Sequence, residues 1–92
     1  MNDIRIVKFG AEWCGPCKQQ DKELAKLDYK VEYINVEEEE EMVEKHNIRT
    51  VPTTLILQGN EEVHRFIGLT KVSAINEYLN TLQDGLSNNL ED

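Results

Sequence analysis

Cysteine and histidine are scarce in this chain. Its 92 residues include only two cysteines, Cys14 and Cys17, and two histidines, His46 and His64. Two cysteines form at most one intramolecular disulfide, which excludes the multi-bridge framework of small secreted domains. A structural zinc site needs about four ligands, and no second cysteine pair or closely spaced histidine pair supplies them. The sequence therefore predicts no metal site and favours a reversible redox couple.

Basic residues and long apolar stretches are also few. Ten Lys and Arg against 18 Asp and Glu give a formal net charge of -8, which opposes binding to nucleic acid phosphates or anionic membranes. No apolar stretch approaches the ~20 residues that span a bilayer, and the first residues lack the pattern of a secretory signal. We expect a cytoplasmic monomer with neither nucleic acid nor a membrane as its partner.

The hydrophobic pattern predicts an α/β fold in the order βαβαββα, with a four-stranded mixed sheet and helices on both faces. The expected strands are residues 4–9, 30–36, 53–58 and 62–67, and the expected helices are residues 14–28, 38–46 and 71–83. The first strand is apolar on both faces, so it should be central. Thr70 is the expected cap of the last helix and Gly85 its end. Residues 1–84 would then form one domain, and residues 85–92 a short tail.

The two cysteines stand at the predicted start of a helix, in the segment EWCGPCKQ. A helix N-terminus directs free N–H groups and the positive end of the dipole at the first sulfur, which stabilises a thiolate. Cys14 is therefore the candidate nucleophile, and Cys17, one turn deeper, the candidate resolving thiol. Gly15 lets a partner's backbone approach, and Pro16 stiffens the loop. Trp13, beside Cys14, is expected to contact the substrate as well as to pack.

The segment AEWCGPCK resembles the active-site sequence of the thioredoxin family, and IRTVPTTLIL and GNEEVHRFIG extend the similarity over about residues 4–82. The resemblance implies a thioredoxin-like fold in a short form, without the family's first strand and helix. It places Pro52 at the family's cis-proline and Gly68 at a glycine after the last strand. The Val51 backbone beside that proline would then hydrogen-bond an extended substrate peptide.

The same resemblance implies a thiol–disulfide oxidoreductase that reduces protein disulfides by dithiol exchange through the CGPC motif. It implies no bound cofactor beyond the redox-active Cys14–Cys17 disulfide, and electrons from an NADPH-dependent flavoprotein, thioredoxin reductase. Disulfide-containing proteins such as a ribonucleotide reductase are the implied substrates. Two alternatives stay open: a glutaredoxin-like reductase coupled to glutathione, and a non-enzymatic interaction module on the same fold.

Lys8 departs from the family pattern, because it occupies the position of a buried aspartate credited with accepting the resolving cysteine's proton. Tyr33 stands where that aspartate's lysine neighbour is common, and Gly10 replaces an aromatic residue. An unpaired buried ammonium is costly, so Lys8 either extends to water or pairs with a carboxylate such as Glu37. Alternatively, its charge lowers the pKa of the thiols, or neutral Lys8 relays a proton. From the sequence we expect Cys17 to lose its proton to water or a nearby carboxylate. Lys8→Met should then have little effect on the pH dependence of mixed-disulfide resolution.

Overall fold

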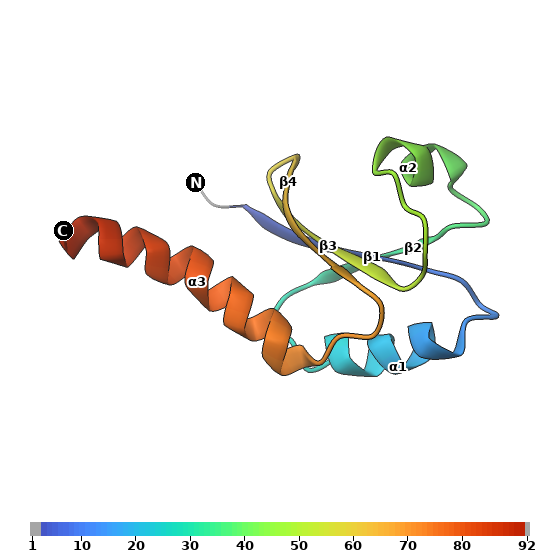
Figure 1. Cartoon of the computed structure of the whole chain (residues 1–92), viewed down its shortest axis with the longest axis horizontal. Helices are drawn as coiled ribbons and strands as arrows, with labels where there is room; N and C mark the ends of the chain where they lie inside the picture. The colour runs from blue at the N-terminus through green and yellow to red at the C-terminus, as the bar shows by residue number, and fades with distance from the viewer. Residues whose placement is uncertain (1–2, 92) are drawn as a thin grey trace.

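The computed structural model describes the backbone of residues 3–91 and the side chains of residues 3–82. Its strands are β1 (Ile4–Gly10), β2 (Val31–Asn35), β3 (Thr53–Gln58) and β4 (Glu61–Ile67), and its helices are α1 (Gly15–Leu24), α2 (Glu40–Lys45) and α3 (Val72–Glu91). The strands form one sheet in the order β2-β1-β3-β4. The predicted element order and mixed four-stranded sheet are confirmed (Figure 1).

β1 lies inside the sheet because both of its faces are apolar. It pairs in parallel with β2 and antiparallel with β3. The face that carries Ile6 packs against α1 and α3, in a cluster with Leu24 and Ile75. The face that carries Val7 and Phe9 packs against α2, on the opposite side of the sheet (Figure 1). Burying each large apolar side chain contributes roughly 1.5–3 kcal/mol, so both helical layers hold β1 in place.

Both ends of α1 follow from local contacts. Cys14 is the N-cap: its backbone is extended, and its Sγ accepts a hydrogen bond from the Cys17 N–H at 3.1 Å. Pro16 lies in the first turn, where its missing N–H breaks no helical hydrogen bond. The helix ends at Leu24, earlier than predicted. After the helix, the N–H groups of Lys26 and Leu27 donate hydrogen bonds to the carbonyls three residues before them. This tight turn leads Leu27 into the core.

The end of α2 is attached to β4. Asn47 has a φ of 53°, the left-handed conformation that asparagine often adopts where a helix stops. Arg65 of β4 donates a hydrogen bond to His46 O at 2.7 Å and pairs with Glu62 at 2.6 Å. These contacts satisfy a carbonyl at the helix end and set the start of the segment that runs from α2 to β3.

The start of α3 differs from the prediction. Thr70 does not cap it, because the Thr70 hydroxyl donates to Gly68 O at 3.1 Å. The Val72 N–H instead donates to Glu23 Oε1 of α1 at 2.8 Å. This hydrogen bond is the main reason that the pKa of Glu23 is lowered. A side chain distant in sequence therefore supplies the cap that we assigned to a local residue.

The predicted end of α3 at Gly85 is wrong, because the helix continues to Glu91 and extends beyond the sheet (Figure 1). A glycine inside a helix costs only about 1 kcal/mol relative to alanine, so it does not compel a stop. The division into a domain of residues 1–84 and a tail of residues 85–92 stays a prediction. Within the described part of the chain, no helix combines the length and apolar character needed to cross a bilayer.

Thr54 of β3 is 0% exposed, and its Oγ1 has no hydrogen-bond partner among the side chains and backbone described. Thr54→Val replaces this hydroxyl by a methyl group. We therefore expect the free energy of unfolding to rise by about 1 kcal/mol, measured by urea denaturation of the oxidised protein. Thr53→Val is the matched control: Thr53 is 2% exposed but donates to Thr50 O at 2.7 Å. The control should lose about 1 kcal/mol; equal losses in both variants would contradict the prediction.

Candidate active site

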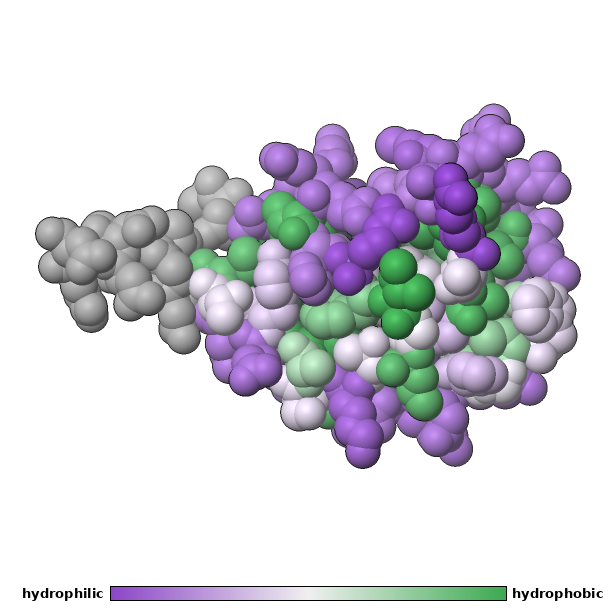
Figure 2. Space-filling view, viewed as in Figure 1, coloured by the Kyte–Doolittle hydropathy of each residue, from purple (hydrophilic) through white to green (hydrophobic). Residues whose placement is uncertain are grey.

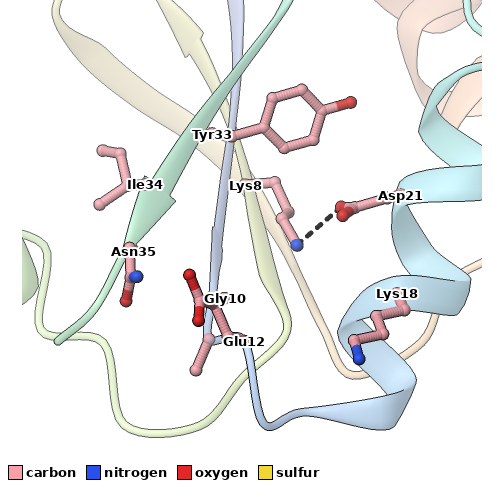
Figure 3. Close-up of a pocket in the computed structure, with 9 residues that line it drawn as sticks. Lys8, Gly10, Glu12, Lys18, Asp21, Tyr33, Ile34 and Asn35 are labelled. Atoms are coloured by element: carbon pink, nitrogen blue, oxygen red, sulfur yellow. Dashed lines mark ion pairs between the residues drawn. The ribbon is translucent and has the colours of Figure 1, made fainter.

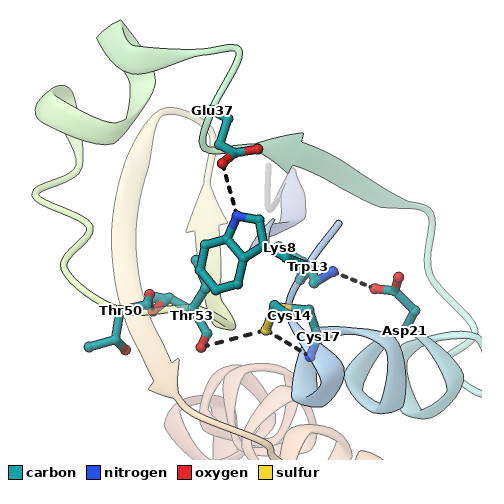
Figure 4. The surroundings of a disulfide bond; sticks show 9 residues. Lys8, Trp13, Cys14, Cys17, Asp21, Glu37, Thr50 and Thr53 are labelled. Carbon is teal, nitrogen blue, oxygen red and sulfur yellow. Dashed lines mark hydrogen bonds and ion pairs between the residues drawn. A yellow bond between two sulfur atoms is a disulfide. The ribbon is translucent and has the colours of Figure 1, made fainter. Parts of the chain in front are cut away.

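Cys14 and Cys17 are joined by a disulfide at the N-terminus of α1 (Figure 4). Cys14 faces the segment before β3, where its Sγ lies 3.9 Å from Val51 O. Cys17 lies deeper, with 1% of its surface exposed. The Cys17 N–H that points at Cys14 Sγ would stabilise a thiolate there once the disulfide is reduced. The arrangement is therefore suited to thiol–disulfide exchange at Cys14.

A backbone ledge lies opposite Cys14. The Val51–Pro52 peptide bond is cis, as the resemblance implies, and the Gly68 N–H donates to Pro52 O at 2.8 Å. Gly68 has a φ of 86°, a conformation that favours glycine. The three residues predicted to form this part of the substrate site, Val51, Pro52 and Gly68, thus lie together beside the disulfide.

Apolar side chains reach the surface around the disulfide. Trp13, Ile67 and Leu69 are 67%, 65% and 51% exposed. Figure 2 shows apolar surface on this face where β4 runs towards α3, with hydrophilic side chains over α2. Trp13 Nε1 donates to Glu37 Oε2 at 2.9 Å, which fixes the ring over the loop (Figure 4). Gly15 is open to solvent, since a Cβ there would meet nothing within 4 Å.

Gln20 of α1 connects the helix to the turn that follows Gly68. It is 0% exposed, its Nε2 donates to Thr70 O at 2.8 Å, and its Oε1 accepts the Thr70 N–H at 2.7 Å. One buried amide thus satisfies a backbone donor and a backbone acceptor of the same residue. This contact holds the segment around Gly68 to the helix that carries the cysteines.

Lys8 is buried under α1 with 5% of its surface exposed. Its Nζ forms an ion pair with Asp21 Oδ1 at 2.7 Å and lies 5.7 Å from the centre of the Tyr33 ring (Figure 3). The expected pairing of Lys8 with a carboxylate is confirmed, but the example Glu37 is wrong, because Glu37 binds Trp13 and the partner of Lys8 is Asp21. Lys8 does not extend to water either.

Gly10 provides the space that Lys8 occupies. A Cβ on Gly10 would lie 2.6 Å from Lys8 Nζ and 3.3 Å from Cys17 Sγ, both closer than an ordinary contact.

A cavity of about 600 Å³ adjoins Gly10 and is lined by Lys8, Glu12, Lys18, Asp21 and Tyr33 among others (Figure 3). Burial, and then the charge of Asp21, raise the pKa of Tyr33. Tyr33 therefore faces this space as a neutral side chain near neutral pH.

Sequence reasoning missed Asp21 and Gln20, although part of the signal was present. Asp21 follows Cys17 by four residues in a helix, so both share one face. Strand alternation places Lys8 on the face of β1 that α1 covers. Gln20 gave no signal, because a glutamine in a helix is usually exposed. Among the described residues, no group of three or more possible ligands lies close enough to hold a metal ion.

Comparisons with known proteins agree on one family. The family model described as Thioredoxin matches residues 1–81. The chain is 36% identical over 72 residues to a thioredoxin of Mycoplasma pneumoniae, covering 73% of this chain and 71% of that protein. It is 33% identical over 83 residues to a thioredoxin of Bacillus subtilis, covering 84% of this chain and 80% of that protein.

Solved structures show the same similarity in three dimensions. A mutant thioredoxin of Halobacterium salinarum superposes with a TM-score of 0.76 at 28% identity, covering 84% of this chain and 72% of that one. Oxidised mitochondrial thioredoxin 3 of Saccharomyces cerevisiae gives a TM-score of 0.73 at 26% identity, with 84% of this chain and 76% of that one covered.

Gln20→Leu removes both hydrogen bonds to Thr70. We expect the free energy of unfolding to fall by about 2 kcal/mol, because a buried N–H and a buried C=O lose their partners. Hydrogen exchange of the Thr70 amide should also become faster, since it loses its acceptor. Gln19→Leu, at the exposed neighbouring position, is the matched control and should change neither quantity appreciably. An unchanged Thr70 exchange rate in Gln20→Leu would count against the role assigned to this side chain.

Proposed function

Because this chain belongs to the thioredoxin family and is a protein-disulfide oxidoreductase, we propose that Cys14 is its nucleophile and Cys17 its resolving thiol. The observation that carries this assignment is the hydrogen bond from the Cys17 N–H to Cys14 Sγ at the start of α1. That sulfur also faces the ledge at Val51 O. Cys17 is more deeply buried, so a protein substrate reaches Cys14 first.

The exchange proceeds in two steps. The Cys14 thiolate attacks one sulfur of the substrate disulfide, the substrate S–S bond breaks, and a mixed disulfide forms. Cys17 then loses its proton and attacks Cys14 Sγ, which releases the second substrate thiol. Two electrons have passed to the substrate, and the Cys14–Cys17 disulfide seen in the structure is the product.

The surface around Cys14 is proposed to bind the substrate backbone and its neighbouring side chains. The Val51 carbonyl and N–H can pair with an extended peptide, with Pro52 and Gly68 shaping the ledge. Trp13 offers an exposed ring held by Glu37. The open position at Gly15, with exposed Pro16 beside it, lets a substrate backbone come close.

The wider redox system is part of the proposal. An NADPH-dependent flavoprotein, thioredoxin reductase, would return the disulfide to the dithiol, and disulfide-containing proteins such as a ribonucleotide reductase would be its substrates. We place the protein in the cytoplasm, where reducing conditions keep such a pair available as thiols. The protein is proposed to act as a monomer.

Reduction of a protein disulfide, such as those of insulin, tests the assignment of the cysteines. With dithiothreitol as recycling reductant, we expect turnover by the wild type and none above background by Cys14→Ser. Cys17→Ser should accumulate a mixed disulfide with the substrate, visible by intact-mass analysis, because the resolving step is blocked. If the trapped bond formed at Cys17 in Cys14→Ser and not at Cys14 in Cys17→Ser, the two roles would be reversed.

The recycling reductant separates the alternatives. Turnover supported by NADPH and thioredoxin reductase favours the proposed system. Turnover only with glutathione and its reductase would favour a glutaredoxin-like enzyme. A wild type without turnover under any of these reductants would make the interaction module the better account.

A further inference from the structure

Lys8 carries a charge that the fold itself does not need. Its neighbours in the sheet are Tyr33 on β2 and Thr54 on β3, neither of which is ionised near neutral pH. A buried ion pair is a weak source of stability, and apolar residues of similar volume often replace one without loss. The 5% exposure of Lys8 therefore calls for an explanation beyond packing.

The ammonium of Lys8 borders the resolving sulfur. The point at which a Cβ on Gly10 would lie is 2.6 Å from Lys8 Nζ and 3.3 Å from Cys17 Sγ. The absence of a side chain on Gly10 leaves these two groups in one small space. The apolar side chains of Ala11, Val36 and Val51 pack around the cysteine pair and bring no charge that would screen the ammonium.

Two cations and two carboxylates line this space, and water screens them to different extents. Asp21 pairs with Lys8 through its buried Oδ1, but the Asp21 side chain as a whole is 47% exposed against 7% for that of Lys8. Water therefore reaches the rest of the carboxylate and screens it more than the ammonium. Tyr33 is neutral. Glu12 and Lys18, which also line the cavity, are exposed and opposite in sign. The buried ammonium is thus the least screened charge near the sulfur.

A negative charge develops on Cys17 only during the resolving step. Its S–H proton passes to solvent water, the Cys17–Cys14 bond forms, and the bond from Cys14 to the substrate sulfur breaks. The substrate leaves as a thiolate that takes a proton from water. We propose that the Lys8 ammonium stabilises the Cys17 thiolate in this step, an inference that rests on the proposed roles of the two cysteines.

Asp21 is the competing candidate, as the acceptor of the Cys17 proton. Its Oδ1 is buried and has no hydrogen-bond partner among the described residues, so the 2.7 Å contact with Lys8 is ionic without hydrogen-bond geometry. This oxygen is already in contact with Lys8 Nζ, and no hydrogen bond joins it to Cys17. We therefore assign Asp21 the role of counter-charge that allows Lys8 to be buried.

Rapid mixing of the reduced protein with excess Ellman's reagent separates the two chemical steps. The first thionitrobenzoate is released when Cys14 attacks, at a rate proportional to reagent concentration. The second is released when Cys17 resolves the mixed disulfide, at a rate independent of it. A wild type that never releases the second would overturn the proposed function, whereas the inference about Lys8 concerns only how the second rate depends on pH.

Lys8→Met should give a pH profile that crosses that of the wild type, in contrast to the small effect expected from the sequence alone. Loss of a neighbouring positive charge raises the pKa of a thiol by about one unit or more, so roughly tenfold less thiolate is present near neutral pH. A more basic thiolate is intrinsically more nucleophilic, which offsets part of this loss. We expect the second rate to be about threefold slower near pH 7 and about threefold faster on the alkaline plateau.

Three further variants complete the test. Lys8→Gln is also neutral and should reproduce the crossing, which keeps the test valid if Lys8→Met does not fold. Lys18→Met removes an exposed lysine of the same cavity and should leave the profile nearly unchanged. Asp21→Asn should resolve as fast as the wild type near pH 7, or faster, because the ammonium loses its counter-charge.

Two results would overturn the inference. Equal slowing of Lys8→Met and Lys8→Gln at every pH, without a shift of the profile, would show that Lys8 acts only through packing. Slow resolution in Asp21→Asn with a normal profile in Lys8→Met would identify Asp21 as the proton acceptor.

Discussion

The burial of β1 on both faces is the constraint on which the rest of the structure depends. Its two apolar faces require a helical layer on each side, so α1 and α2 must lie on opposite sides of the sheet. The connection from β1 to α1 then begins at the end of a central strand. This places the N-terminus of α1, with Cys14 as its cap, at the edge of the core, where a sulfur can be both oriented and reached.

The same constraint determines the surroundings of Lys8. A residue at an inward position of a covered strand cannot reach water, so a lysine there needs a partner within the layer above. Asp21 on α1 supplies the opposite charge, and Gly10 leaves the space that the long side chain fills. The three residues form one arrangement, because the cation needs both the counter-charge and the room. The ammonium is thereby held near Cys17 Sγ, on the other side of the space left by Gly10.

Contacts between segments distant in sequence hold the surface around the disulfide. Gln20 of α1 binds both backbone groups of Thr70, and Glu23 caps α3. Glu37 accepts a hydrogen bond from Trp13, the residue before Cys14. Each contact connects the helix or loop that carries the cysteines to a segment distant in sequence. The position of Cys14 relative to the ledge therefore depends on a few polar side chains and on the two apolar clusters.

Much of the fold could be predicted because its signals are local. Alternation in the strands, the turn between β3 and β4, and the left-handed stop at Asn47 follow from nearby residues. Helix ends were less predictable: α1 ends early at Leu24, and α3 continues through Gly85. In both cases the propensity of single residues was too weak to determine where a helix stops, since packing of the whole helix contributes more.

The sequence by itself determined the chemistry of the pair Cys14 and Cys17, because motif, spacing and helix start all lie within one short segment. Only the tertiary structure decided which groups surround that pair. The partner of Lys8 is Asp21 and not Glu37, and the cap of α3 is Glu23 and not Thr70. The reason is physical: a buried charge or a free N–H pairs with whichever side chain the packing of α1 brings close to it. The separation of two residues in the sequence does not predict whether packing brings them together.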